Sequence, residues 1–441
     1  MRVSRILLTV AAVGVCALVG ASVVGPAAPA ASTAAESVVG TYYPVEPDRL
    51  MDTRSGLGGQ TGPLGAGQVA TLQVGGRGGV PASGAGSVVL NVTVVGPTAA
   101  SYLTLYPAGA ARPTASSINY AAGWLGSNNV TVKLSTDGRV AIYQHAGATD
   151  VVVDVVGFYA ADESVRAGLG RGGQLRRVEP TRLVDTRREG DPIPARKRIN
   201  RWVDLGPDSP RVRALVLNVT AVAPENAGYL SAWAGDGPLP GSSTVNYAAD
   251  AVVPNLAYVR AATCHDCGPW YGVPMFSVYT STASHIVVDL VGVIDDGTLP
   301  GGLRFTPSNP TRIVDSRSGL GTSGALGANV TRRVVAPPAV VTDATAVLAM
   351  NVTAVAPTTA TVITLWPADL GVARPGVSNL NPAAQQTVAN AVLAVIGPQD
   401  AFHVHNAGGS THVLADVVGA FTVPAGGTAA EPMRVLGTGG Y

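Results

Sequence analysis

The sequence predicts an all-β protein of three tandem homologous antiparallel β-sandwich or barrel modules of about 120 residues each. Short runs rich in Val, Ile, Thr and Tyr alternate with Gly, Pro, Asn and Asp, as strands alternate with turns. No window of about ten residues has the apolar spacing of an amphipathic helix. One series of motifs occurs three times in the same order, which indicates the three modules.

The chain begins with the composition of a secretory signal peptide, assigned to residues 1–30. Arg2 and Arg5 precede an apolar run at 6–24, and small residues at 27–31 offer cleavage sites. The sequence therefore predicts export, with no membrane association after cleavage. An uncleaved anchor is the alternative, because an apolar run of this length is able to span a bilayer.

Each module starts with an arginine- and aspartate-rich motif. It reads Pro-Asp-Arg-Leu-Met-Asp-Thr-Arg at 47–54 and returns in similar form at 180–187 and 310–317. Spacings of 133 and 130 residues between the copies fit small domains and are too long for a solenoid repeat. The predicted parts are modules at 41–162, 175–296 and 303–424, and a flexible C-terminal tail at 425–441.

Within the first module, strands are predicted at 88–95, 102–106, 130–134, 139–143 and 151–156. Asp137 and Gly138 separate two of these strands and predict a hairpin turn, because Gly tolerates the positive φ that such a turn requires. Alternation along the first strand places Asn91 and Thr93 on one face with Val89. We therefore expect polar groups in apolar surroundings.

Each module repeats two Arg, two Asp and an Asn at matching positions. Two cations and two anions sum to zero charge, which suits a buried hydrogen-bonded network, and Arg pairs bidentately with carboxylate. We interpret the set as a structural brace, with a ligand site repeated three times or acid–base catalysis as alternatives. Pairing with Arg is expected to lower the pKa of these Asp carboxyls, which disfavours catalysis. The set is Arg49, Asp52, Arg54, Asn91 and Asp154; Arg182, Asp185, Arg187, Asn218 and Asp289; Arg312, Asp315, Arg317, Asn351 and Asp416; a further asparagine recurs as Asn129, Asn255 and Asn390.

One aromatic position also recurs, as Tyr106, Trp233 and Trp366. Strand alternation places each ring beside a Ser or Thr hydroxyl, on the polar face of its strand. An aromatic ring flanked by hydroxyl groups is suited to stacking on a sugar, so we predict that these three residues bind a ligand. The alternative is a half-buried packing role beneath a loop.

The second module contains an insertion with a cysteine pair. In an exported chain, Cys264 and Cys267 are predicted to form a disulfide, since a zinc site requires two more ligands. Trp270 and Tyr271 follow in the same insertion and are predicted contact residues. A stapled surface loop without a binding role is the alternative.

Composition and motifs argue against several functions. Charged residues make up 13% of the chain and the net charge is +1, so no electrostatic field attracts nucleic acid. The sequence has no HExxH, P-loop or dinucleotide motif, and no GxSxG outside the signal region. The six His do not recur at one position in all modules. We therefore predict no metal, no cofactor and no catalytic residues.

The motif series R-L-x-D-T-R, V-L-N-V-T-A-V, L-T-x-W-P and V-V-V-D-V-V-G resembles a tandem β-rich module of secreted actinobacterial cell-surface proteins and exported hydrolases. The resemblance covers residues 44–160, 177–294 and 307–423. It implies an exported, non-catalytic, surface-associated protein and names no substrate, because no activity is established for the module.

We therefore expect a secreted, extracellular or cell-wall-associated protein that binds glycan or cell-wall polysaccharide. The alternatives are a structural or adhesive surface protein and a secreted glycan hydrolase using carboxylates of the Asp154 type. An enzyme usually concentrates its catalytic set once, whereas this chain spreads the same neutral polar set over three modules. The sequence leaves open the oligomeric state, and also the choice between separate modules and one closed unit.

Overall fold

The computed structural model describes residues 37–265 and 267–440, and the predicted signal peptide at 1–30 lies outside them. From Val38 onward the chain forms one structural unit. None of the helices in the described residues has the length and apolar composition that crossing a membrane requires.

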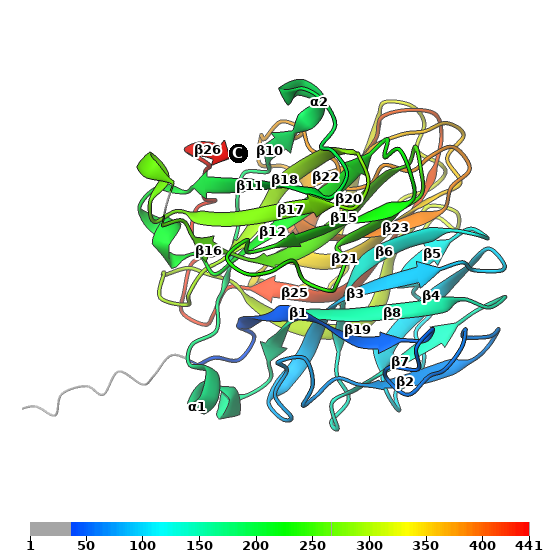
Figure 1. Ribbon diagram of the computed structural model, residues 1–441, viewed down its shortest axis with the longest axis horizontal. Coiled ribbons are helices and arrows are strands. Elements are labelled where there is room, and N and C mark those ends of the chain that lie inside the picture. Colours follow the sequence, from blue (N-terminus) through cyan, green and yellow to red (C-terminus); the bar gives the residue numbers. More distant parts are fainter. Residues whose placement is uncertain (1–36, 266, 441) are drawn as a thin grey trace, which may run out of the picture. The chain divides into compact units, whose positions relative to one another are not determined.

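The prediction of an all-β, antiparallel fold is confirmed (Figure 1). Three stretches of chain follow one another, and we name them the first, second and third segments. The first contains β1 (Tyr42–Asp52), β2 (Val69–Gln73), β3 (Ala85–Val95), β4 (Ser101–Pro107), β5 (Ile118–Tyr120), β6 (Leu125–Lys133), β7 (Arg139–Gln144) and β8 (Asp150–Ala160). The second contains β9 (Leu175–Arg176), β10 (Thr181–Asp185), β11 (Lys197–Asp204), β12 (Ala214–Val222), β13 (Gly228–Trp233), β14 (Val245–Tyr247), β15 (Val252–Arg260), β16 (Ala262–Thr263), β17 (Pro274–Thr280) and β18 (His285–Ile294).

The third segment contains β19 (Arg304–Asp315), β20 (Val330–Val335), β21 (Thr345–Val355), β22 (Ile363–Pro367), β23 (Val388–Val395), β24 (Ala401–Asn406) and β25 (His412–Thr422), and β26 (Gly437–Gly440) follows it. The described helices are short, with six residues or fewer: η1 (Glu163–Val165), α1 (Arg166–Leu169), α2 (Thr186–Glu189), η2 (Gly206–Arg211), η3 (Gly268–Trp270) and η4 (Pro398–Asp400).

Each segment is a sandwich of two sheets. In the first, Leu90 of β3 and Val153 of β8 share a buried core with Leu72 of β2 and Ile142 of β7, which belong to the opposite sheet. The inner sheets have the strand orders β1-β8-β3-β6, β10-β18-β12-β15 and β19-β25-β21-β23. The outer sheets are β2-β7-β4-β5, β14-β13-β17-β11-β26 and β20-β24-β22.

The second face of each inner sheet packs against the other two segments. A central cluster joins Tyr159 of the first segment, Tyr258 of the second and Phe305 of the third, and the ring centroids of Tyr159 and Phe305 lie 4.4 Å apart. The glycine that closes the recurrent VVDVVG motif makes room for this cluster: a Cβ on Gly157 would collide with the ring of Tyr42. Burial on both faces explains why the inner strands are continuous hydrophobic runs.

Backbone hydrogen bonds near the start of each segment close a ring. The amide of Tyr42 donates to the carbonyl of Gly173, at 2.8 Å, just before the second segment. Leu175 donates to Leu303 at 2.9 Å, and Phe305 donates to Gly40 at 2.8 Å. The three segments are therefore packed as one closed unit, which answers the question that the sequence left open.

The predicted hairpin at Asp137 and Gly138 is wrong. A turn is present, since Gly138 has a φ of 73° and its amide donates to the carbonyl of Ser135. However, β6 before the turn belongs to the inner sheet and β7 after it belongs to the outer sheet. The turn carries the chain from one layer to the other, which turn chemistry alone does not distinguish from a hairpin.

The prediction of a flexible tail at 425–441 is also wrong for the described residues. Met433 lies in the core of the second segment and is 8% exposed. Beyond it, β26 pairs with β11 as an added antiparallel edge strand, with Gly439 opposite Trp202 (Figure 1). Low sequence complexity suggested disorder, but unpaired backbone groups on the edge of β11 provide hydrogen-bond partners for this segment.

Candidate functional site

The predicted Arg–Asp brace is present in all three segments. In the third, Arg312 binds Asp416 in a bidentate pair, with Nε to Oδ1 at 2.8 Å and Nη2 to Oδ2 at 3.0 Å. Arg317 binds Asp315 in the same way, at 2.9 and 2.7 Å. The carboxylate of Asp416 is almost completely buried, whereas Arg317 is about half exposed. Equivalent pairs form between Arg49 and Asp154, Arg54 and Asp52, Arg182 and Asp289, and Arg187 and Asp185.

The two kinds of aspartate have opposite pKa shifts. Hydrogen bonds from Arg187 and Arg317 lower the pKa of Asp185 and Asp315 to about 2, as the sequence predicted, and Arg54 lowers the pKa of Asp52. For the other three carboxyls the expected direction is wrong: burial raises the pKa of Asp154, Asp289 and Asp416, and the Arg partner offsets this only in part. Pairing alone did not indicate how completely water is excluded.

The lowered pKa of Asp315 predicts a pH-dependent effect of replacing its partner. Above pH 4, Arg317→Gln is expected to reduce stability by about 0.5–1 kcal/mol, since the arginine is half exposed. Because the pKa of Asp315 is about 2 in the folded protein against its usual 3.8, the contribution of the pair is lost as pH falls through this range. Thermal midpoints of both proteins from pH 2 to 6 should therefore converge at the acid end. A constant difference would contradict the assignment.

The recurrent asparagines bond between segments. Asn91 lies on β3 and donates to the carbonyl of Ser243 in the second segment, at 2.6 Å. Asn255 on β15 donates to Oδ1 of Asn91 at 2.8 Å and accepts from the backbone amide of Asn129 at 2.8 Å. The sequence identified the buried polar set but not that it crosses between segments. We call this contact the first–second boundary.

The same arrangement occurs at the other two boundaries. At the second–third boundary, Asn218 donates to the carbonyl of Ser378 and Asn390 donates to Asn218 Oδ1. At the third–first boundary, Asn351 donates to Ser116 and accepts from Asn128, at 2.6 and 2.9 Å. The counterpart of Asn255 and Asn390 in the first segment is therefore Asn128, and the sequence assignment of Asn129 was one residue out of register.

The recurrent aromatic residues differ in exposure. Tyr106 and Trp233 are 7% and 4% exposed, and Trp366 is partly buried. In each segment the loop after the strand covers the outer sheet; we name these cover loops 108–117, 234–244 and 368–379. The hydroxyls of Thr104 and Ser231, predicted beside the aromatic rings, donate to cover-loop carbonyls at 3.0 and 2.7 Å. The proposed binding role of Tyr106 and Trp233 stays a prediction, with little surface available to a ligand.

Trp366 lines a cleft of about 390 Å³ at the second–third boundary, which we name the Trp366 cleft. Leu393 and Val395 of β23 line its wall. On the cover loop, Leu370 and Val372 also line it and are 47% and 51% exposed. Charged and amide groups, including Arg177, Glu179, Asn218 and Asn379, complete the lining. The cleft is thus mainly apolar with a few polar groups, the usual composition of a small-ligand site.

Two side chains in the wall of the Trp366 cleft are smaller than their counterparts at the first–second boundary. Strand register makes Leu393 the counterpart of Tyr258, and Val395 the counterpart of Arg260. Arg260 fills its boundary and pairs with Glu46 across it, with Nε to Oε1 at 2.6 Å. Sequence reasoning missed Leu393 and Val395 as lining residues. Comparing aligned positions among the three copies points to Val395 alone, because the other two copies have the long side chains Lys133 and Arg260 there.

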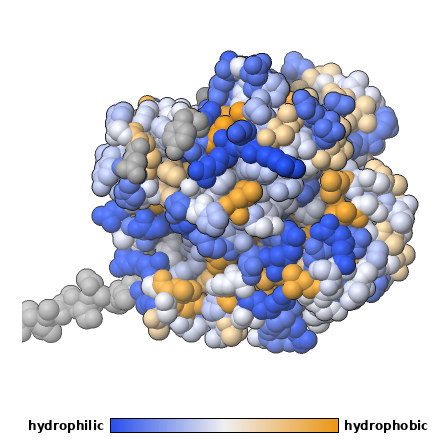
Figure 2. All heavy atoms as spheres, in the orientation of Figure 1, coloured by the Kyte–Doolittle hydropathy of each residue, from blue (hydrophilic) through white to orange (hydrophobic). Residues whose placement is uncertain are grey.

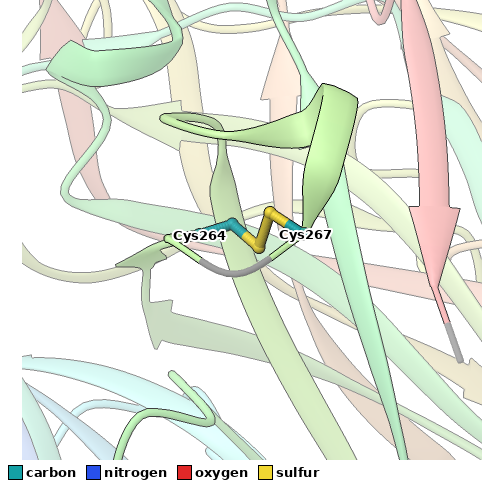
Figure 3. Close-up of a disulfide and its surroundings, with 2 residues drawn as sticks. All are labelled: Cys264 and Cys267. Carbon is teal, nitrogen blue, oxygen red and sulfur yellow. A yellow bond between two sulfur atoms is a disulfide. The ribbon is translucent and has the colours of Figure 1, made fainter.

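The predicted disulfide between Cys264 and Cys267 is confirmed (Figure 3). Cys264 is buried with Trp202 and Val273, and Trp270 packs partly buried against the same group. Tyr271 is 69% exposed, so the two predicted contact residues of this loop are in different environments. Neither lines the Trp366 cleft.

On the face shown in Figure 2, the apolar areas of the surface are small and are separated by hydrophilic ones. Among the described residues, no group of three or more His, Cys, Asp or Glu is arranged to hold a metal ion.

Comparisons with known proteins identify no family. No family model matches the chain, and no curated protein matches it. One matching solved structure is described as "The Triple Jelly Roll Fold and Turret Assembly in an Archaeal Virus"; it is 9% identical over 90% of this chain and 92% of that chain, with a TM-score of 0.17. At this identity and score, the likeness indicates nothing about function.

Proposed function

We propose that this is a secreted, non-catalytic protein of the cell surface that binds a polysaccharide chain in the Trp366 cleft. The observation that carries the proposal is the cleft itself, where an indole and apolar side chains meet polar groups in a space of about 390 Å³. Sugar rings have apolar faces that stack on aromatic rings and hydroxyls that bond to polar groups. The Cys264–Cys267 disulfide supports a location outside the cell, since disulfides persist in oxidising compartments.

The polar groups of the cleft are suited to hydroxyl recognition. Glu179 offers carboxylate oxygens and is exposed, with Arg434 Nη2 at 3.0 Å from its Oε1. Arg177 holds the carbonyl of Ala430 at 2.7 Å and retains further N–H donors. Donors and acceptors therefore lie beside an aromatic ring, as a neutral sugar requires.

We propose one ligand-binding site per chain, whereas the repeated sequence motifs suggested three. Tyr106 and Trp233 are buried beneath their cover loops, so Trp366 is the member of the set that combines exposure with a large cleft.

Hydrolysis has less support, because Asp154, Asp289 and Asp416 are 0% exposed and bound to Arg. A structural or adhesive role is the second candidate, favoured by the asparagine bonds at all three boundaries.

The test is depletion of the mature protein from solution by insoluble polysaccharides and isolated cell walls. We expect wild-type protein to be retained, and Trp366→Leu to weaken retention by about tenfold, because stacking and cleft contacts are lost. Trp233→Leu is the matched control, since it removes an indole from the equivalent strand position without altering the cleft. Circular dichroism confirms that each variant is folded.

A second variant blocks the cleft without removing the tryptophan. Leu393→Tyr with Val395→Arg introduces the residues of the first–second boundary, where Tyr258 and Arg260 occupy the equivalent space. This variant should remain folded and lose retention. Retention of both cleft variants at the wild-type level, or no retention of wild-type protein by any polymer, would reject polysaccharide binding here and leave the structural role.

A further inference from the structure

A second cleft lies at the second–third boundary and shares Pro375 and Val377 of the cover loop with the Trp366 cleft. Its volume is about 340 Å³. We name it the basic cleft because Arg182, Arg187 and Arg374 line it. No carboxylate is among the described residues that line it.

The charge of Arg374 is uncompensated. Arg182 and Arg187 share the carboxylates of Asp289 and Asp185, whereas Arg374 has no carboxylate partner among the described residues. Instead, its guanidinium donates to Nε2 of His405.

His405 acts as a neutral acceptor in this arrangement. The residue is 3% exposed, and its Nδ1 lies 3.0 Å from the hydroxyl of Thr331. Burial and the neighbouring Arg374 lower the pKa of His405. The neutral imidazole therefore orients Arg374 through Nε2 without cancelling its charge.

A second feature of the basic cleft is a buried hydroxyl. Thr220 lines the same cleft, is 4% exposed, and its hydroxyl has no hydrogen-bond partner among the described residues. Asn381 also lines the cleft, and its Oδ1 is occupied by the hydroxyl of Ser378 at 2.9 Å. Guanidinium, amide and hydroxyl groups therefore line one space. Because buried polar groups usually have hydrogen-bond partners, this space is suited to a polar ligand.

The equivalent position at the first–second boundary lacks this charge. At the first–second boundary, Arg49 Nη2 donates to the carbonyl of Gly241 at 3.2 Å. At the second–third boundary, Arg182 Nη2 donates to the carbonyl of Gly376 at 3.5 Å, so Gly241 and Gly376 are equivalent positions of the two cover loops. Two residues before Gly241 stands Leu239, in the place of Arg374. The first–second boundary therefore closes without an arginine at this place. In the first segment the corresponding residue is Arg112, which also precedes a proline and lies over the ring of Tyr143, 3.7 Å from its centroid.

We propose that the basic cleft binds an oxyanion, a carboxylate, phosphate or sulfate group, between Arg187 and Arg374. Arginine forks bind such groups bidentately with charge-assisted hydrogen bonds, and one net positive charge fits one anionic group. The proposal does not depend on polysaccharide binding in the Trp366 cleft. The anion is either a free ion or an acidic group carried on a polymer.

Calorimetric titration with inorganic phosphate at fixed ionic strength tests the proposal. Wild-type protein should give a saturable one-site isotherm, and Arg374→Gln should weaken binding by at least about tenfold. Arg187→Gln should weaken it similarly. Arg54→Gln is its matched control, because it breaks the equivalent bidentate pair, with Asp52, outside this cleft.

A second arm distinguishes the sources of the anion. An acidic polysaccharide bearing carboxylates is compared with its neutral counterpart. Displacement of the acidic polymer by phosphate assigns the site to a polymer-borne group, and binding of phosphate alone assigns it to the free ion. The proposal is overturned if neither probe binds saturably, or if Arg374→Gln binds phosphate as tightly as Arg54→Gln.

Discussion

Asn255→Leu is expected to lower the free energy of unfolding by about 3–5 kcal/mol, a larger loss than most single substitutions cause. The side chain is 0% exposed and bonds to Asn91 Oδ1, to the carbonyl of Thr244 and to the amide of Asn129, at 2.8, 2.7 and 2.8 Å. Leucine keeps the volume but removes the bonds to Asn91 Oδ1 and to the Asn129 amide, and leaves the Thr244 carbonyl with the hydroxyl of Ser127 alone, at 3.1 Å. Chemical denaturation followed by far-UV circular dichroism measures the change.

Asn129→Leu provides the matched control for this prediction. Asn129 is also buried, but its Oδ1 has no hydrogen-bond partner among the described residues. Its counterparts in the other segments are Leu256 and Ala391, so an apolar side chain is accepted at this position. We expect little loss or a small gain of stability. Equal losses for the two variants would show that the asparagine bonds between segments do not stabilise the unit.

Asp416→Ala is expected to cost about 3 kcal/mol, because it leaves the guanidinium of Arg312 without its main partner. The carboxylate is 0% exposed, and Arg312 is 19% exposed with Asp315 at 3.5 Å, which places the loss at the lower end for a buried pair. The same denaturation measurement applies. Asp137→Ala, in the exposed pair with Arg139, should change stability little.

The double variant Arg312→Met with Asp416→Leu tests whether the protein needs the charges of this ion pair or only two side chains that pack together. Replacing both members of a buried pair by apolar groups is often neutral, because the desolvation cost of the charges disappears. The double variant should therefore be more stable than Asp416→Ala. A double variant as unstable as the single one would indicate that the carboxylate has a further partner.

Both proposed sites lie at the second–third boundary, whose lining residues differ from those of the first–second boundary. Leu393 and Val395 line the Trp366 cleft where the first–second boundary has the larger Tyr258 and Arg260, and Arg374 lines the basic cleft where that boundary has Leu239. The positions shared by all three copies, such as Asn91, Asn218 and Asn351, close the boundaries instead.

The sequence by itself determined the strands, the antiparallel sandwich and the disulfide, because these depend on local side-chain pattern and short spacing. It also identified the buried Arg–Asp pairs, since charged side chains that lie in apolar strands must pair with opposite charges to offset the cost of leaving water. It predicted a single residue incorrectly in the asparagine set, because adjacent Asn128 and Asn129 differ only in which strand face they occupy.

Only the tertiary structure decided which surfaces are covered. The cover loops bury Tyr106 and Trp233, the closed packing of three segments places the asparagines between them, and β11 pairs with a glycine-rich C-terminal strand. Water exclusion at Asp416, which reverses the expected pKa shift, arises from the same packing. The asparagine bonds, the pairing of β11 with β26 and the burial of Asp416 depend on contacts between residues more than 100 positions apart, and strand periodicity contains no information on such contacts.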